Sequence, residues 1–229
     1  MSAERMPLRG IRAVAIDLDG TLVDTSHDFH VSINLLRAEL SLAPLSLIAI
    51  TRLVGRGADH LIRQLLAVDF APAEVEARFA DTLARYLHHY RINNGLHSSI
   101  YPGVYEGLAG LQAMGLRMAC VTNKPFEFAD ALLAQRGLRE YFEVVYGGDS
   151  LPARKPDPLP LLQVCSDFQL APSALLMIGD SCNDAMAARA AGCPVLMVPY
   201  GYNYGEDVHA IDSDGIVATL HAALPALET

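Results

Sequence analysis

The chain has 229 residues, of which 52% are hydrophobic and 19% are charged, and its formal net charge is −9 at pH 7. A chain of this length buries a substantial core, either as one domain or as one domain with a sizeable insertion. The acidic balance, without a run of basic residues, argues against a nucleic-acid partner, and no apolar segment reaches the ~18 residues that a membrane span requires.

The first predicted element is a short buried strand that ends in two carboxylates. Residues 14–16 are apolar and run into Asp17, Leu18, Asp19 and Gly20. In an extended backbone, residues two positions apart point to the same side, so we expect the two carboxylates to share one site. Two like charges held that close are unfavourable unless a proton, a cation or a function offsets them. The glycine lets backbone N–H groups approach a phosphate closely.

A long helical stretch separates this strand from the next one. A complete strand–helix–strand unit takes ~30 residues, but the second strand begins only near Arg117. The surplus carries apolar residues at helical spacing, most clearly between residues 75 and 90. We predict that residues 24–95 form a helical cap inserted into a core made of residues 1–23 and 96–229. Such an insertion would lie above the carboxyl ends of the strands, where open α/β sheets bind ligands.

After residue 100, short apolar runs alternate with helical patterns. Four runs are typical of buried parallel strands: 117–122, 142–147, 174–180 and 194–199. The helical segments between them begin at prolines and end at glycines, as in 102–115 and 125–137. This alternation predicts an α/β fold, in which a Rossmann-like open parallel sheet carries helices on both faces and the helical cap is inserted after the first strand.

Polar side chains follow each predicted strand. In chain order they are Asp17 and Asp19, then Thr122, Asn123 and Lys124, then Lys155, and finally Asp180 and Asp184. Parallel strands bring their carboxyl ends to one edge of a sheet, so we expect these side chains to converge. An oxygen-rich set without histidine suits a hard cation such as Mg²⁺. Thr122 and Lys155 would add a hydrogen bond and a charge for phosphoryl oxygens.

The paired carboxylates suggest a specific chemistry. An aspartate can attack phosphorus and form an aspartyl-phosphate. A second carboxylate, when protonated, can donate to the leaving oxygen and then activate water. The sequence therefore predicts that one carboxylate of the first strand is a nucleophile, that its neighbour is an acid/base, and that a metal holds the two together.

Four stretches of the sequence, DLDGTLVDT, VTNK, RKPDP and GDSCND, resemble in order the four motifs of the haloacid-dehalogenase-like hydrolase superfamily. The resemblance implies Asp17 as nucleophile and Asp19 as general acid/base. It implies further that the phosphate is bound by Thr122, Asn123 and Lys155, and that Mg²⁺ is held by Asp17, the backbone carbonyl of Asp19 and Asp180, with Asp184 in support.

Three features narrow the reaction. Family members that dehalogenate lack an acid at the position of Asp19, and the phosphonate-cleaving branch needs a cap lysine for a Schiff base, whereas residues 24–95 contain none. The stretches LVGRGADHLIRQLL and VPYGYNYGE resemble the phosphoglycolate phosphatase branch. We therefore expect a Mg²⁺-dependent phosphomonoesterase for a small phosphorylated metabolite, 2-phosphoglycolate. Arg56, between two glycines, is predicted to meet a substrate carboxylate unless it is a solvated turn residue.

Several alternatives remain open at this point. The enzyme alternatives are a phosphatase of another small ester or of pyrophosphate, and a sugar phosphomutase. A phospho-acceptor signalling domain uses similar residues but is about half as long. Lys124, beside Thr122, has either a direct role or only a helix-entry or rim role. Residues 200–203 either take part in the site or form a turn that packs the core.

The four cysteines form no C-x-x-C pair, so we expect free thiols in a reducing cytoplasm. The first apolar run soon meets Asp17, so we expect no signal peptide. For the oligomeric state, a monomer and a homodimer both remain open.

Overall fold

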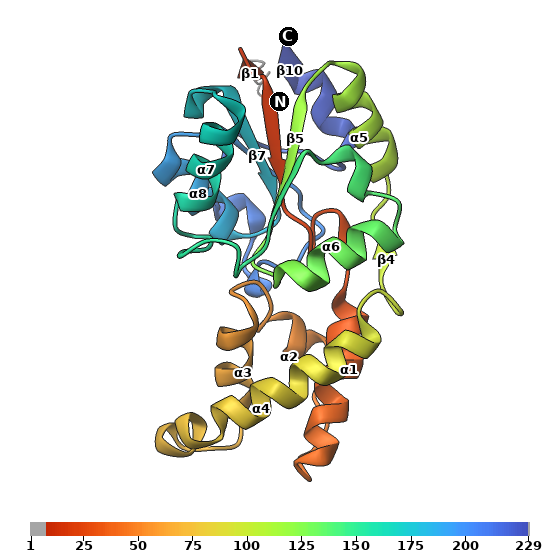
Figure 1. Ribbon diagram of the computed structural model, residues 1–229, viewed down its shortest axis with the longest axis vertical. Coiled ribbons are helices and arrows are strands. Elements are labelled where there is room, and N and C mark those ends of the chain that lie inside the picture. Colours follow the sequence, from red (N-terminus) through yellow and green to blue (C-terminus); the bar gives the residue numbers. More distant parts are fainter. Residues whose placement is uncertain (1–7, 229) are drawn as a thin grey trace.

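Six parallel strands form the main sheet of the computed structural model, which describes residues 8–228. They are β2 (Ala13–Ile16), β5 (Arg117–Val121), β6 (Val144–Tyr146), β7 (Leu175–Gly179), β8 (Val195–Met197) and β9 (Gly215–Ile216). Their spatial order is β6-β5-β2-β7-β8-β9, so that β2 lies inside the sheet (Figure 1). The predicted α/β fold and its five predicted strands are confirmed. The sixth strand, β9, was not predicted, because two residues carry no recognisable pattern.

Helices cover both faces of the sheet, as predicted. The side chains of β2 alternate: Val14 and Ile16 belong to one hydrophobic cluster, whereas Ala13 and Ala15 belong to the other. The first cluster includes α5 (Val104–Ala113) and α6 (Phe126–Gln135), and the second includes α7 (Leu159–Phe168) and α8 (Cys182–Ala191). On this second face α7 lies over β2 and β5, whereas the alanine-rich α8 lies over β7 and β8.

A separate group of helices lies beyond the carboxyl edge of the sheet (Figure 1). These are α1 (Ser26–Glu39), α2 (Leu47–Thr51), α3 (Ala58–Leu66) and α4 (Pro72–Asn93). They surround a hydrophobic cluster of their own, to which α3 contributes Leu61, Ile62, Leu65 and Leu66 at helical spacing. Pro72 occupies the first helical position of α4, where a missing N–H costs nothing. The limits of this unit as a domain, residues 24 and 95, stay a prediction.

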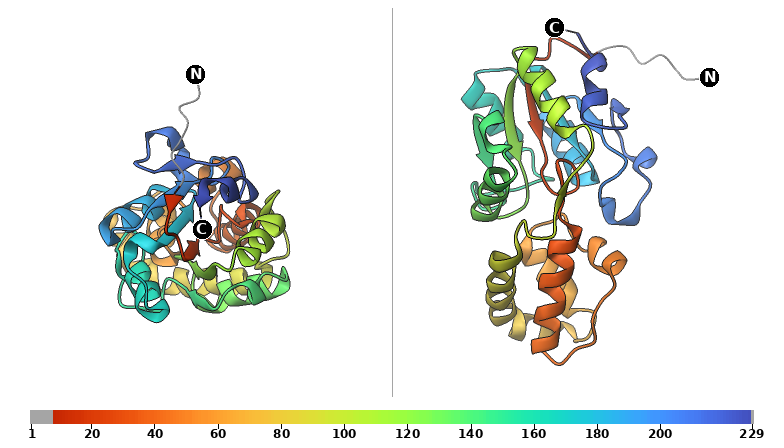
Figure 2. Two further views of the ribbon diagram at one scale, coloured as in Figure 1. Left: turned by 90° about the horizontal axis from the view of Figure 1, so that it is seen from above. Right: turned by 90° about the vertical axis from the view of Figure 1, so that its right-hand side faces the viewer.

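Two chain segments join the helical group to the sheet (Figure 2). They pair as a short antiparallel ribbon of β3 (Val23–Asp24) and β4 (Ser99–Ile100), which was not predicted. Asp28 at the start of α1 is fully buried, and its carboxylate accepts hydrogen bonds from the backbone N–H groups of Gly95 at 2.9 Å and His97 at 2.7 Å. The entry and exit of the helical group are thus tied together by hydrogen bonds.

The remaining elements are short. β1 (Leu8–Arg9) pairs in parallel with β10 (Leu227–Glu228). Five short 3₁₀ helices complete the described chain: Arg139–Tyr141, Pro172–Ala174, Asn203–Gly205, Val208–Ala210 and His221–Ala226.

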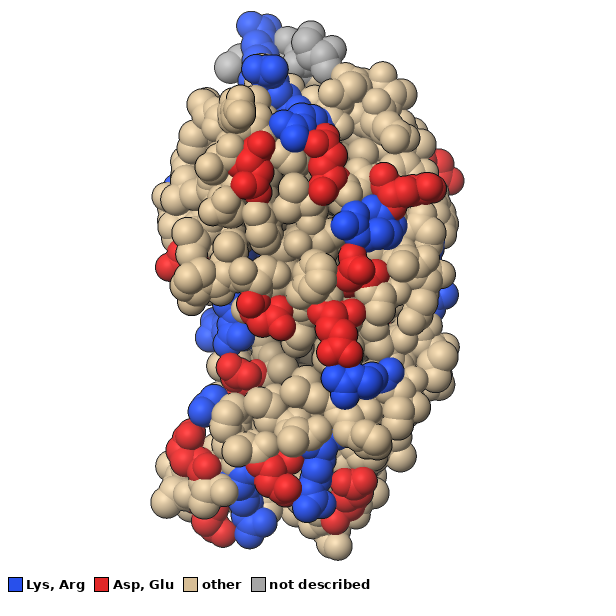
Figure 3. Space-filling model, viewed as in Figure 1, with Lys and Arg blue, Asp and Glu red and all other residues tan. Residues whose placement is uncertain are grey.

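The distribution of charge on the surface and the state of the cysteines match what the sequence predicts. Basic and acidic residues are interspersed over both parts of the face shown in Figure 3. Within residues 8–228, no helix has the length and apolar character needed to cross a membrane. The four cysteines, all of which lie in the described part of the chain, are free thiols as predicted, and three of them are buried.

Candidate active site

A small pocket lies between the carboxyl edge of the sheet and the helical group. Its volume is about 50 Å³, whereas a single water needs ~10–15 Å³ on the same measure. The polar lining residues include Asp17, Asp19, Thr122, Asn123 and Lys124, and the helical group adds an apolar wall made mainly of Phe29, Val54, Leu61, Tyr86, Leu87 and Tyr90. The pocket is therefore suited to a small ligand with one polar and one apolar side.

Asp17 lies where β2 ends and faces this pocket. Its side chain is buried; Oδ1 accepts a hydrogen bond from the backbone N–H of Leu18 at 2.7 Å and forms an ion pair with Lys155 Nζ at 3.0 Å. Burial raises the pKa of Asp17 to about 7; the charge of Lys155 opposes this shift, and that of Asp184 adds to it. A buried carboxylate that lines a pocket and has a perturbed pKa is well placed to react with a ligand.

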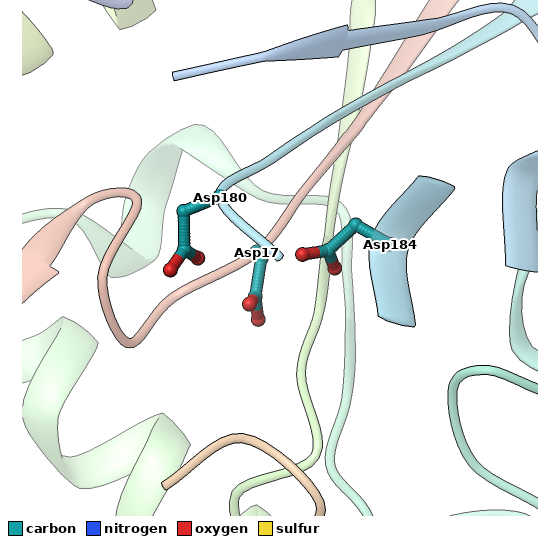
Figure 4. A group of neighbouring side chains, drawn as sticks. All are labelled: Asp17, Asp180 and Asp184. Carbon is teal, nitrogen blue, oxygen red and sulfur yellow. The ribbon is translucent and has the colours of Figure 1, made fainter. Parts of the chain in front are cut away.

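Three carboxylates converge beside the pocket. One oxygen from each of Asp17, Asp180 and Asp184 lies within 4.8 Å of the others, and Figure 4 shows the carboxylates of Asp180 and Asp17 side by side, with that of Asp184 directed toward them. Asp180 follows β7 and accepts hydrogen bonds from Thr21 Oγ1 at 2.9 Å and from the backbone N–H of Tyr202 at 2.7 Å. Burial raises the pKa of Asp180, with the neighbouring carboxylates adding to the shift. This all-oxygen donor set fits a hard divalent cation such as Mg²⁺.

Glycines make room for these carboxylates. Gly20 has a φ of +86°, and a Cβ added to it would lie 2.5 Å from Asp180 Oδ2. A Cβ on Gly201 would overlap the side chain of Asp180, and one on Gly179 would overlap Asp184. The glycine after the first carboxylate pair is therefore needed for the left-handed backbone and for the close approach of Asp180. The carboxylate cluster occupies space that any side chain at these positions would fill.

Asp184 is held from several directions by protein groups. It is fully buried in the first turn of α8, where Oδ2 accepts hydrogen bonds from Ser181 N at 3.0 Å and Ser181 Oγ at 2.9 Å. Its other oxygen accepts a hydrogen bond from Lys155 Nζ at 2.6 Å. Because both oxygens already have protein partners, Asp184 is suited to supporting the cluster from behind.

Lys155 neutralises part of this negative charge. Its side chain is 2% exposed, and Nζ donates to the carbonyl oxygen of Val121 at 2.6 Å in addition to its contacts with Asp17 and Asp184. Burial disfavours the charged ammonium, but the two carboxylates outweigh it and raise the pKa of Lys155. The three N–H groups of this lysine thus face three acceptors in the protein.

Thr122 and Asn123 follow β5 and line the pocket. Thr122 is 3% exposed, and its Oγ1 accepts a hydrogen bond from the backbone N–H of Lys124 at 3.2 Å. Asn123 Nδ2 donates to the carbonyl oxygens of Lys155 at 2.7 Å and Gly55 at 2.9 Å. Asn123 Oδ1 is a buried acceptor that has no partner among the described residues, so the asparagine can accept a hydrogen bond from a ligand.

Asp19 lies at the junction between the sheet and the helical group. Its Oδ1 accepts hydrogen bonds from Thr25 Oγ1 at 2.8 Å and Lys124 Nζ at 3.0 Å. An interpretation of Lys124 as only a helix-entry or rim residue misses this contact. The scarcity of lysine was the available signal: the chain contains only Lys124 and Lys155, and both lie against carboxylates of the first strand.

Arg56 is not brought into the pocket lining. Its side chain is exposed, and its guanidinium lies 5.1 Å from the ring centroid of Tyr204. The neighbouring Gly55 does approach the sheet, because its carbonyl oxygen accepts hydrogen bonds from Asn123 and, at 3.0 Å, from Asn183. A role of Arg56 in substrate binding stays a prediction.

The stretch 200–203 packs against the site. Tyr200 donates a hydrogen bond from its hydroxyl to the carbonyl oxygen of Thr21 at 2.9 Å, and the Tyr202 hydroxyl donates to Asp24 Oδ1 at 2.8 Å. Together with the bond from Tyr202 N to Asp180, these contacts place the stretch behind the carboxylate cluster. It therefore belongs to the structural support of the site.

Comparisons with known proteins give one consistent family. A model of the family described as haloacid dehalogenase-like hydrolase matches residues 11–192. A Thiobacillus denitrificans protein named phosphoglycolate phosphatase is 48% identical over 213 residues, which cover 93% of this chain and 94% of that protein. A plasmid-encoded phosphoglycolate phosphatase of Cupriavidus necator is 42% identical, and the match covers 95% of this chain and 93% of that protein.

A solved structure is similar over the same extent. The crystal structure of a predicted phosphoglycolate phosphatase from Haemophilus somnus superposes with a TM-score of 0.88 at 32% sequence identity. The match covers 94% of this chain and 97% of that protein. The similarity thus includes both the sheet and the group of helices beyond its carboxyl edge.

Proposed function

The chain belongs to the haloacid dehalogenase-like hydrolase family, and we propose that it is a Mg²⁺-dependent phosphatase that hydrolyses 2-phosphoglycolate to glycolate and phosphate. The observation that carries the proposal is the buried Asp17, which faces a small pocket beside Asp19 and contacts Lys155. The names of the relatives that match nearly the whole chain support the substrate. The small volume of the pocket supports a compact ester.

The proposed reaction has two steps. An oxygen of Asp17 attacks the phosphorus atom, the bond from phosphorus to the ester oxygen breaks, and Asp19 gives a proton to that oxygen as glycolate leaves. Asp19 then takes a proton from water, whose oxygen attacks the phosphorus of the aspartyl-phosphate. The bond from phosphorus to the Asp17 oxygen breaks, which releases inorganic phosphate and restores the carboxylate of Asp17.

The hydroxyl of Thr122 and the backbone N–H of Asn123 would donate hydrogen bonds to the phosphoryl oxygens. The Asn123 side chain stays hydrogen-bonded to the carbonyl oxygens of Gly55 and Lys155. Lys155 would stabilise the negative charge of Asp17 and, once Asp17 is phosphorylated, the negative charge of the phosphoryl group.

The residues present fit a magnesium ion, because three carboxylates meet in a buried, all-oxygen cluster. We propose that Asp17, Asp180 and the backbone carbonyl of Asp19 hold it, while Asp184 supports the cluster through Lys155 and Ser181. When bound, such an ion supplies positive charge that offsets the carboxylates and the phosphoryl oxygens. Gly20 provides the space that this arrangement needs beside Asp180.

We propose further that residues 24–95 act as a cap over a core of residues 1–23 and 96–229. The helical group supplies the apolar wall of the pocket, and Gly55 is hydrogen-bonded to Asn123 and Asn183 of the sheet part. A cap closed in this way excludes water and bulky substrates from the reacting groups. The free cysteines support a place in the cytoplasm, where we propose that the enzyme works as a monomer or homodimer.

Phosphate release from a panel of substrates tests the proposal. We expect kcat/KM for 2-phosphoglycolate in the presence of Mg²⁺ to exceed the values for other small esters, pyrophosphate and hexose phosphates by about tenfold or more. A higher value for another ester or for pyrophosphate would contradict the substrate and leave the phosphatase reaction intact. Interconversion of hexose phosphates without net phosphate release would instead favour a mutase.

Magnesium is expected to stabilise the protein more at pH 8 than at pH 5. In the metal-free folded protein, burial raises the pKa of Asp17 from 3.8 to about 7. The folded state therefore binds a proton that the unfolded state releases, and the stability this gives is lost as pH rises through about 7. Burial of Asp180 acts in the same direction. At pH 8 the ion meets charged carboxylates, whereas at pH 5 it must displace a proton.

Thermal unfolding at the two pH values checks this expectation. With Mg²⁺ at one fixed concentration, about 100 times its Kd at pH 8, we expect a rise in Tm of roughly 5–10 °C at pH 8 and a clearly smaller rise at pH 5, where the Kd is higher. Sodium chloride at equal ionic strength is the control for general salt effects. Equal shifts at both pH values, or equal shifts with sodium, would contradict a metal site at these carboxylates.

A further inference from the structure

Lys124 occupies a position that the reaction described above does not use. It lines the pocket on the side of the helical group, two residues after Thr122. We propose that Lys124 binds the carboxylate of the substrate and so gives the enzyme its preference for phosphate esters that carry a second anionic group. This inference rests on the proposed function, whose phosphoryl group would lie against Asp17 and Thr122.

The first support is the environment of the ammonium group. Lys124 is only 5% exposed, although lysine is rarely buried without a specific partner. Its Nζ donates to Asp19 Oδ1 at 3.0 Å and to the hydroxyl of Tyr90. The same nitrogen lies 5.1 Å from the ring centroid of Phe29 and 4.6 Å from that of Tyr90. Aromatic faces favour a cation and hold it in place without consuming its N–H groups.

The second support is the number of acceptors around each lysine. An ammonium group has three N–H donors. Those of Lys155 face three protein groups, namely Val121, Asp17 and Asp184. The ammonium of Lys124 has two partner groups among the described residues: both carboxylate oxygens of Asp19, at 3.0 and 3.3 Å, and the hydroxyl of Tyr90. Because the 3.3 Å contact to the second oxygen of Asp19 is long and goes to a group already bonded, a substrate oxygen in the pocket can replace it as the third acceptor.

The third support is the charge balance of the pocket. Lys124 is the only lysine or arginine among the described residues that line it. The other charged lining residues are Asp17 and Asp19, and the wall formed by the helical group is apolar. A substrate carboxylate placed there without a counter-charge would lose its hydration and be repelled by both aspartates. In a two-carbon ester the carboxylate lies close to the phosphoryl group. Thr122 and Lys124, which both line the pocket and are two residues apart, can therefore contact the two groups of one substrate.

Arg56 is the other cation for which a carboxylate-binding role is predicted, and the geometry favours Lys124 over it. The side chain of Arg56 is exposed, and its guanidinium lies over the ring of Tyr204 instead of facing the pocket. An exposed arginine contributes less to selectivity than a buried ammonium, because water competes for its hydrogen bonds and screens its charge.

The test compares two substrates that differ at one group. 2-Hydroxyethyl phosphate has the same chain length as 2-phosphoglycolate but carries a neutral alcohol in place of the carboxylate. The selectivity is kcat/KM for 2-phosphoglycolate divided by kcat/KM for 2-hydroxyethyl phosphate. An effect of a substitution on the chemical step that is common to both substrates cancels in this ratio. We expect Lys124→Met to lower this ratio by roughly 10- to 100-fold, as expected for a lost hydrogen bond to a charged group.

Two further variants keep the test decisive. Lys124→Gln has no charge but retains polar atoms for Asp19 and Tyr90, so it guards against a packing defect in the methionine variant. We expect it to lower the ratio in the same direction. Arg56→Met is the matched variant for the competing cation, and a collapse of the ratio in that variant but not in the Lys124 variants would overturn the inference.

The outcomes for the proposed function and for Lys124 are separate. If the wild-type enzyme hydrolyses both substrates equally well, the proposal that its substrate carries a carboxylate is wrong. A wild-type preference that both Lys124 variants retain would overturn the assignment of Lys124 and leave the proposed substrate standing. Only a wild-type preference that is lost in the Lys124 variants supports the inference.

Discussion

Asp17→Asn is expected to lower kcat for 2-phosphoglycolate by at least about 10⁴-fold, because the amide cannot replace the carboxylate as nucleophile. The asparagine has nearly the same volume, so the pocket keeps its shape. The substitution also removes one charge from a cluster in which Asp17, Asp180 and Asp184 lie within 4.8 Å of one another. We therefore expect the variant to remain folded, so that a loss of steady-state phosphate release does not arise from unfolding.

The control is Asp157→Asn, the same chemical change at an exposed aspartate two residues after Lys155. Asp157 accepts a hydrogen bond from the backbone N–H of Leu159 at 2.8 Å, which an asparagine oxygen can also accept. We expect this variant to keep wild-type activity within about twofold. Intact mass must show that the asparagine introduced by Asp17→Asn has not deamidated back to aspartate. Substantial turnover by a verified Asp17→Asn protein would disprove the nucleophile.

Lys155→Met is expected to cost both activity and stability. The lysine is 2% exposed and contacts Asp17 at 3.0 Å and Asp184 at 2.6 Å. Its removal leaves buried carboxylates without their cation, which typically costs about 3–5 kcal/mol of unfolding free energy. At pH 8 the full cost applies. At pH 5 we expect a smaller cost, because Asp17, whose pKa is raised to about 7 by burial, then carries a proton.

Denaturant unfolding of the metal-free proteins measures this difference. Arg139→Met is the matched control, since Arg139 pairs with Asp130 at 2.6 Å on the surface, where both side chains are about 40% exposed. Exposed pairs of this kind contribute about 1 kcal/mol or less. Adding Asp184→Asn to Lys155→Met should recover part of the loss, because it removes one unpaired charge. A loss below about 1 kcal/mol for Lys155→Met would refute the charge-compensating role.

The sequence determined the architecture through local patterns. The apolar runs at 117–122 and 174–180 correspond to β5 and β7, because a strand buried on both faces needs apolar residues on both. The polar residues after those runs come together because parallel strands bring their carboxyl ends to one edge. In this way Asp17, Thr122 and Asp180 meet although more than fifty residues separate each from the next. Their roles in catalysis stay predictions.

Shorter and more distant pairings were decided by tertiary structure. β9 and the ribbon of β3 and β4 have two residues per strand, too few to show a period. The need for Gly179 and Gly201 arises from the space taken by Asp184 and Asp180. Whether glycine is required at these positions depends on how the loops pack against the carboxylate cluster, and a local sequence pattern does not show that packing.

The difference between local patterns and tertiary contacts also explains why the sequence was least informative about Lys124 and Arg56. The sequence left a direct role and a rim role open for Lys124, which is buried because α4 brings Tyr90 onto its ammonium and the strand end brings Asp19. Arg56 was predicted either to meet a substrate carboxylate or to be a solvated turn residue. Its guanidinium lies over the ring of Tyr204, and its role in substrate binding stays a prediction. A sequence determines which residues end each strand, because periodicity and turn residues are local. The direction and partners of a long side chain are decided only when the helical group packs on the sheet, since those contacts join residues far apart in the chain.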